Sequence, residues 1–172
     1  MSVFKKTKTP AKPIITVEAI DWTRDRSDVL RIEYVAFPAN MRSNEFDLAN
    51  QLKKGFGLLA RRSGCKNPVG YVIAMPLEQA CYQGCSTDRS EKKTAYIESL
   101  AITPSERTAL LRLTRDLFDR LEQKGYERVT MHVETDSNLH NTILGIGGKE
   151  LVRFDNWQGW RKNFAYLEIS LN

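Results

Sequence analysis

The sequence has no hydrophobic run that approaches the roughly 18–20 residues of a membrane-spanning helix, and this excludes a transmembrane helix. Its first residues, MSVFKKTKTPAKP, are basic, but no apolar stretch follows them as it would in a secretory signal. We therefore expect a cytoplasmic protein that does not bind membranes.

Cysteine and histidine are also scarce. The three cysteines, Cys65, Cys81 and Cys85, are an odd number, which argues against a disulfide framework. Cys81 and Cys85 flank YQG and could form a redox pair or half of a metal site, but the two histidines, His132 and His140, lie far along the chain. We favour free thiols and expect no metal.

The remaining composition is that of a soluble globular domain, with 41% hydrophobic and 27% charged residues in a chain of 172. The net charge of +5 comes largely from Lys5, Lys6, Lys8 and Lys12, so the rest of the chain is nearly neutral and does not indicate a nucleic-acid-binding face. We predict a disordered basic tail over residues 1–13, which could contact nucleic acid, and a single domain over residues 14–172.

Hydrophobic patterns predict five elements in the first half of the chain. The predicted strands are residues 14–20, 56–62 and 69–77, the last two being a hairpin. One predicted helix covers residues 25–37 after a cap at Asp21 or Thr23, and a second begins after Ser43 and ends at Gly55.

The second half is predicted to alternate strands and helices. The predicted strands are residues 94–102, 128–134, 149–157 and 163–171. One predicted helix covers residues 105–124, with Ser105 as N-cap and Gly125 as C-cap, and a short one covers residues 137–145.

This order predicts an α/β (α+β) fold with a mixed, mostly antiparallel sheet of six or seven strands and helices on both faces. The strands over 95–102 and 128–134 should be parallel neighbours joined by a right-handed crossover.

Two stretches carry a family resemblance. In YIESLAITPSER…LFDRLEQKGYERVTMHVE, a strand ends in a hydrophobic-x-Pro pattern and a KGY turn follows the long helix. In ETDSNLHNTILGIGGKEL, a helix begins near Asn138 and ends near Gly148. With the element order over residues 14–171, these stretches resemble the GCN5-related N-acetyltransferase (GNAT) superfamily.

The resemblance implies that the two parallel strands splay apart and bind acetyl-CoA as a co-substrate in the gap, with no metal. The pantetheine arm would pair with the backbone of Leu100, Ala101 and Ile102, and Asn138 would contact the same arm. The pyrophosphate would lie on the first turn of the long helix, where N–H groups and the helix dipole favour anions. The residues implied there are Arg107, Thr108, Ala109, Leu110 and Leu111.

The chain departs from the family in this phosphate loop. With Arg107 placed on the motif's arginine, the glycine positions hold Leu110 and Arg112; counted back from Gly125, they hold Thr108 and Leu110. Glycine lets a backbone approach a phosphate closely, so its loss allows side chains to crowd the site. Arg107, Arg112 or Ser105 would have to compensate.

Glu98 is the candidate general base, six residues before Pro104 on a strand whose alternation would place Ile97, Ser99 and Ala101 on the opposite face. A carboxyl among apolar residues has a raised pKa suited to that role. The equally weighted alternative is a structural ion pair, and Glu134 is a weaker candidate.

Many family members carry a tyrosine seven residues after the helix asparagine, where it protonates the leaving thiolate. That position is Gly145 here. His140 or Tyr126 could take this role, or a thiolate with a pKa of about 8.5 could leave unaided.

The resemblance as a whole implies an N-acetyltransferase that moves an acetyl group from acetyl-CoA directly to a primary amine of a small molecule or protein. The aromatic residues Trp157, Trp160, Phe164 and Tyr166 surround the last turn, which in this fold shapes the acceptor pocket. The alternative is a catalytically inactive module that binds a protein or nucleic acid. The last strands could also pair across a homodimer.

Overall fold

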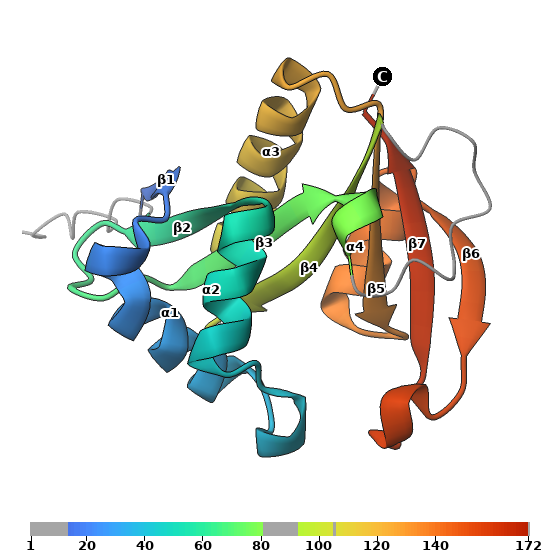
Figure 1. Ribbon diagram of the computed structural model, residues 1–172, viewed down its shortest axis with the longest axis horizontal. Coiled ribbons are helices and arrows are strands. Elements are labelled where there is room, and N and C mark those ends of the chain that lie inside the picture. The colour runs from blue at the N-terminus through green and yellow to red at the C-terminus, as the bar shows by residue number, and fades with distance from the viewer. Residues whose placement is uncertain (1–13, 81–92, 105, 172) are drawn as a thin grey trace, which may run out of the picture.

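The computed structural model describes residues 14–80, 93–104 and 106–171. Within these residues, seven strands form one sheet in the order β1-β2-β3-β4-β5-β7-β6 (Figure 1). The strands are β1 (Ile15–Ala19), β2 (Phe56–Arg62), β3 (Gly70–Pro76), β4 (Thr94–Ile102), β5 (Arg128–Glu134), β6 (Lys149–Phe154) and β7 (Phe164–Ser170). The helices are α1 (Trp22–Ala36), α2 (Glu45–Lys54), α3 (Arg107–Gln123) and α4 (Asn138–Gly145).

The predicted fold class is confirmed. Each described strand pair is antiparallel except β4 with β5, which are the predicted parallel neighbours. The basic tail, Cys81, Cys85 and Ser105 lie outside the described residues, so the expectations placed on them stay predictions.

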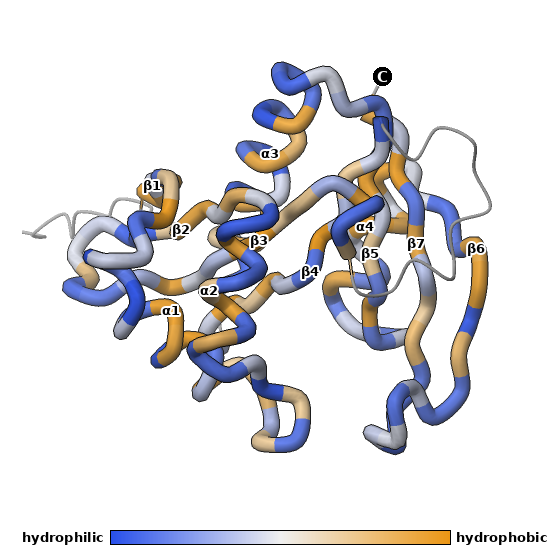
Figure 2. The backbone as a smooth tube through the Cα atoms, viewed as in Figure 1, coloured by the Kyte–Doolittle hydropathy of each residue, from blue (hydrophilic) through white to orange (hydrophobic). Residues whose placement is uncertain are grey.

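Helices cover both faces of the sheet, as predicted. On one face, Leu113, Leu117 and Leu121 of α3 and Ile143 of α4 pack in a continuous core against β2, β3, β4, β5 and β7. On the other face, residues of α1 and α2 pack on β2, β3 and β4. Figure 2 shows hydrophobic and hydrophilic bands alternating along α3, which is the pattern of a helix with one buried side.

Local hydrogen bonds explain where the elements begin and end. Asp21 caps α1 by accepting from the N–H groups of Thr23 and Arg24, and Asn44, one residue after Ser43, caps α2. β6 stops at Phe154, three residues earlier than predicted, because Asn156 adopts a left-handed conformation with φ of 48° that ends the strand.

One irregularity shapes the middle of the sheet. Between β3 and β4, Ile73 pairs with Ser99 while Ala74 pairs with Ile97, so Glu98 is an extra residue without a partner in β3. Such a β-bulge bends its strand and redirects the side chains that follow.

The bulge overturns the predicted alternation along β4. Ile97 packs on the α3 face together with Leu100 and Ile102, whereas Ala101 belongs to the core on the α1 and α2 face. The Ser99 hydroxyl lies on that second face, 2.8 Å from the hydroxyl of Tyr71. The prediction that Ile97, Ser99 and Ala101 share a face is therefore wrong, because the extra residue reverses the alternation.

Of the last two strands in the chain, only β6 lies at an edge of the sheet. β7 lies between β5 and β6 and pairs with both of them. β6 forms one edge of the described sheet, with Leu151 and Val152 exposed. A homodimer through strand pairing therefore stays a prediction for β6 alone.

Candidate active site

β4 and β5 pair only over their first residues, Thr94–Ile97 with Arg128–Met131. Beyond these residues, β4 remains paired with β3 as far as Ile102, and β5 remains paired with β7 as far as Glu134. The strands part at the bulge residue Glu98, where the sheet bends. The predicted wedge between the two parallel strands is confirmed.

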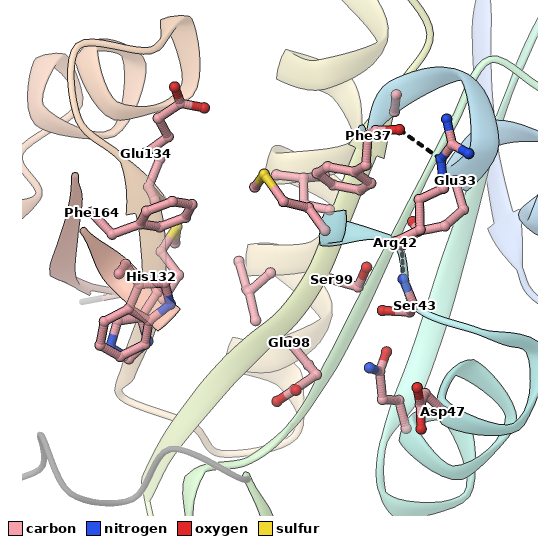
Figure 3. A pocket seen from close by; sticks show the side chains of 18 of the residues that line it. Glu33, Phe37, Arg42, Ser43, Asp47, Glu98, Ser99, His132, Glu134 and Phe164 are labelled. Carbon is pink, nitrogen blue, oxygen red and sulfur yellow. Dashed lines mark hydrogen bonds between the residues drawn. The ribbon is translucent and has the colours of Figure 1, made fainter. Parts of the chain in front are cut away.

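A cleft of about 670 Å³ opens where the strands part. Most of its lining comes from β4, β5, α2, the α1–α2 loop (residues 37–44) and the β6–β7 loop (residues 155–163), and α1, β3, α4 and β7 add one or two residues each. Figure 3 shows His132, Glu134 and Phe164 along one side, facing Glu98 and Ser99 across the cleft. This volume lies within the ~300–1,000 Å³ typical of small-molecule sites.

Glu98 is the unsatisfied carboxylate of this cleft. Its side chain lines the cleft, and its Oε2 atom is buried with no hydrogen-bond partner among the described residues. Burial raises the pKa of the Glu98 carboxyl, and the positive charge of Lys54 offsets part of that rise. A carboxyl with these properties is suited to accept a proton from a bound amine.

Behind Glu98, a buried hydrogen-bond network joins three elements. The Glu33 carboxylate of α1, which is 2% exposed, accepts a short bond from the Tyr71 hydroxyl, and that hydroxyl also contacts Ser99 of β4. The Ser43 N–H donates to Glu33 Oε1 at 2.6 Å, which attaches the α1–α2 loop to the sheet. Burial raises the pKa of Glu33.

His132 of β5 also lines the cleft, although the sequence reasoning did not select it. Its Nδ1 lies 2.8 Å from the Tyr96 hydroxyl, and its ring stacks on Trp157 with the ring centres 4.5 Å apart. Burial lowers the pKa of His132 to about 4, so the ring is neutral at pH 7. The alternation in RVTMHVE, which places His132 and Glu134 opposite the core residues, was the signal that could have found it.

Glu134, the weaker candidate base, lines the cleft but accepts a hydrogen bond from Lys162 Nζ at 2.7 Å. Its carboxylate is therefore already paired, unlike that of Glu98.

His140 and Tyr126, the two candidate acids, do not line the cleft. His140 is a buried residue of α4, and its Nε2 lies 3.0 Å from Glu150 Oε2 on β6. Tyr126 follows α3 and packs against the core just before the first residue of β5, whereas the cleft begins at the other end of that strand. The structure thus keeps both side chains apart from Glu98.

The start of α3 lies after the free part of β4. Arg107 and Thr108 are exposed, while Ala109 and Leu110 are buried in the core and cannot offer side chains to a ligand. Leu111 is exposed, and Asn138 is exposed at the first turn of α4. A helix of this length presents the N–H groups of its first turn to an anion.

Two charged residues near the start of α3, Glu106 and Arg112, form ion pairs. Glu106 precedes α3 and its carboxylate lies 2.7 Å from Arg62 Nη1, so it does not cap the helix. Arg112 Nε lies 3.0 Å from Asp116 Oδ1 one turn along α3. Arg107, in the first turn of α3, is exposed.

Within the described ranges, no group of three or more His, Cys, Asp or Glu side chains could hold a metal ion. None of the described helices is both long enough and apolar enough to cross a membrane.

Neither a protein-family model nor a curated protein matches this chain in sequence. Solved structures match its fold. The ribosomal-protein-S18-alanine N-acetyltransferase from Escherichia coli aligns with a TM-score of 0.70 and 16% identity, over 92% of this chain and 95% of its own. A chain of the NatC complex bound to Gag peptide and CoA aligns with a TM-score of 0.72 and 14% identity, over 92% and 99%.

A GNAT-family protein from Desulfovibrio desulfuricans aligns with a TM-score of 0.70 and 10% identity, over 92% of this chain and all of its own. At such identities the similarity concerns the fold alone. The chain has the fold of the GCN5-related N-acetyltransferase superfamily.

Proposed function

We propose that this protein transfers an acetyl group from acetyl-CoA to a primary amine. The observation that carries the proposal is the buried, unpartnered carboxylate oxygen of Glu98, located where β4 leaves β5 and a cleft opens. A buried carboxylate oxygen without a hydrogen bond lowers the stability of the fold. Such groups cluster at functional sites, where a ligand can supply the missing hydrogen bond.

The described residues fit acetyl-CoA at two places. The backbone of Leu100, Ala101 and Ile102 has β3 on one side and no described strand on the other, so its polar groups can pair with the amides of a pantetheine arm. The exposed first turn of α3, with Arg107 and Thr108, can hold a pyrophosphate, and Asn138 lies at the start of α4 to contact the arm.

Glu98 acts as the base in this proposal. It removes a proton from the acceptor ammonium, and the freed nitrogen lone pair forms a bond to the acetyl carbon while the carbon–sulfur bond breaks. The second proton that the nitrogen loses as the amide forms passes to water. Because His140 and Tyr126 lie outside the cleft, we assign them no part in protonating the sulfur. A thiol pKa of about 8.5 allows the thiolate to leave unaided and take its proton from water.

The experiment combines binding and turnover. Acetyl-CoA binding is measured by calorimetry, and thiol release is followed with a panel of amines, for wild type and Glu98→Gln. We expect Glu98→Gln to lower kcat/KM by roughly 10²–10⁴-fold with acetyl-CoA affinity within about twofold, as for a lost general base. Glu122→Gln, on the exposed side of α3, is the matched control.

The inactive binding module is the second candidate, and the carboxylate of Glu106 at the start of α3 favours it, because a negative charge there opposes phosphate binding. Absence of acetyl-CoA binding at 1 mM ligand, in protein shown to be folded, would select this candidate.

A further inference from the structure

The two loops that close the cleft supply large apolar side chains. Phe37 and Met41 come from the α1–α2 loop, and Trp157, Trp160 and Phe164 come from the β6–β7 loop and the first residue of β7. These side chains and Glu98 line the same cleft, so a molecule whose amine reached Glu98 would have its remaining atoms near them.

The β6–β7 loop holds its tryptophans in a defined arrangement. Asn156, Gln158 and Arg161 adopt left-handed conformations, with φ of 48°, 51° and 58°, which are uncommon for residues other than glycine. The Arg161 N–H donates to Asn156 Oδ1 at 2.8 Å, and this bond closes the loop. The result is that Trp157 stacks on His132, and Trp160 meets Phe164 with ring centres 5.7 Å apart.

Two of the three lysine and arginine side chains in the described lining, Lys162 and Arg42, contact other groups of the protein. Lys162 pairs with Glu134 at 2.7 Å, and Arg42 Nε donates to the Phe37 carbonyl oxygen at 2.7 Å while its guanidinium covers the ring of Tyr34. The third, Lys54, is exposed, and its positive charge offsets part of the rise in the pKa of Glu98. An anionic group on the acceptor would therefore compete with Glu98 for the charge of Lys54.

Two polar atoms of the cleft lining lack a hydrogen-bond donor. Two buried oxygens, Glu98 Oε2 and Gln51 Oε1, have no hydrogen-bond partner among the described residues. An ammonium or amine group donates up to three hydrogen bonds and accepts none while charged, so it complements such oxygens.

We infer that the acceptor is a primary amine next to a large aromatic or aliphatic group, with no anionic group nearby. This inference rests on the proposed acetyltransferase function and names the substrate class of the same cleft. The amine meets Glu98, and the apolar group packs against Trp160 and Phe164. The same chemistry occurs in a free arylalkylamine and in a peptide whose first residue is large and apolar.

Acetylation of matched probes tests this substrate class. Phenylalanine amide and phenylalanine differ only in whether a carboxylate stands beside the amine. We expect kcat/KM to be at least about tenfold higher for phenylalanine amide and for 2-phenylethylamine than for phenylalanine, spermidine or glucosamine. Equal or better turnover of phenylalanine, spermidine or glucosamine would overturn the inference.

A variant tests the aromatic contact. Trp160→Ala should raise KM for 2-phenylethylamine about tenfold, leave kcat within about threefold and leave acetyl-CoA affinity unchanged, because it removes binding area remote from the transferred group. Phe46→Ala, at a position that is 73% exposed and outside the cleft lining, is the matched control. An unchanged KM in Trp160→Ala, with the control behaving as wild type, would contradict the inference.

Binding without turnover separates this inference from the proposed function. Quenching of tryptophan fluorescence by 2-phenylethylamine, lost in Trp160→Ala and not produced by spermidine, would support the ligand class even if no acetyl group were transferred. If acetyl-CoA binds and turns over while neither the apolar amines nor a Phe-Gly-Gly amide peptide binds or is acetylated, the inference is wrong and the proposed function stands. Faster turnover of the peptide than of 2-phenylethylamine would identify a peptide N-terminus as the source.

Discussion

Tyr96 and His132 face each other across β4 and β5 where the strands begin to separate, with the tyrosine hydroxyl 2.8 Å from His132 Nδ1. Tyr96 still belongs to the paired part of β4, whereas His132 lies one residue beyond the last paired residue of β5. This contact joins the two strands at the closed end of the cleft, in an aromatic environment that also contains Trp157 and Tyr166.

The lowered pKa of His132 predicts a pH dependence of stability. The folded protein holds this ring neutral down to about pH 4, while an unfolded histidine takes up a proton near pH 6.5. The unfolded state therefore binds more protons between these values, and the free energy of unfolding falls as the pH is lowered from 6.5 to 4. For one proton the slope is at most about 1.4 kcal/mol per pH unit.

Urea unfolding at several pH values would measure this slope. His132→Phe keeps a ring beside Trp157 and should flatten the dependence between pH 6.5 and 4, whereas Tyr96→Phe keeps the histidine and should preserve it. An equally steep dependence in His132→Phe would assign the effect to another group.

Glu98→Gln should make the protein more stable while it removes activity. Because burial raises the pKa of Glu98 in the fold, the unfolded carboxyl ionises at lower pH, and the fold loses stability as the pH rises through the folded pKa. An uncharged amide avoids this loss, so at pH 7 we expect a gain within the ~0.5–2 kcal/mol typical of relieved functional strain.

Thermal unfolding of Glu98→Gln and wild type at pH 7 and pH 4 provides the check. The difference in stability should be larger at pH 7, and the activity of the wild type should rise with pH through a pKa above 4.5. A variant that is less stable at both pH values would show that Glu98 is a structural residue.

Glu33 should control the order of the α1–α2 loop. It accepts hydrogen bonds from the Ser43 N–H and the Tyr71 hydroxyl. Tyr71→Phe removes one donor from a buried carboxylate and should cost about 1–3 kcal/mol of unfolding free energy. Glu33→Gln can still accept from Ser43 and donate to Tyr71, so we expect an ordered loop.

Amide hydrogen exchange measures how well the α1–α2 loop is ordered. Exchange of the Ser43 amide should speed up in Glu33→Ala and stay near the wild-type rate in Glu33→Gln. Unchanged protection of Ser43 in Glu33→Ala, in protein with an intact core, would mean that the loop is held by other contacts.

The start of α3 offers a test of anion binding by charge. Arg107→Ala should weaken acetyl-CoA binding by roughly 5–10-fold, since it removes the exposed cation from a helix N-terminus. Glu106→Gln should strengthen binding severalfold because it removes a negative charge from the same place. Calorimetry at two salt concentrations measures both, and Arg115→Ala on the exposed side of α3 is the control.

Much of the fold followed from local patterns. The apolar spacing of α3 and the alternation in β5 placed both elements to within a few residues, and the wedge between β4 and β5 was expected from the family resemblance. Asp21 as the cap of α1 was one of two alternatives, and the structure selects it. The helix cap and the positions of α3 and β5 depend on neighbours in the sequence, and for that reason the sequence shows them, whereas the wedge could be expected only from the resemblance.

The site was predicted less completely. Glu98 was predicted as the general base, and it lies in the cleft, but the prediction of which sheet face its neighbours occupy was wrong. His140 was a candidate acid and lies outside the cleft, whereas His132, which lines the cleft, was not a candidate. The identity of a cleft residue depends on which strands pair and where they part, and neither can be counted along one strand.

The sequence by itself determined the kinds of elements, their order and the open sheet that they form, because hydrophobic period and turn residues act over short distances along the chain. Only the tertiary structure decided that Glu98 is the bulge residue without a partner, that His132 meets Tyr96, and that Glu33 holds Ser43. Each of these depends on the register between segments distant in sequence, and a shift of one residue would turn the same side chains to the opposite face.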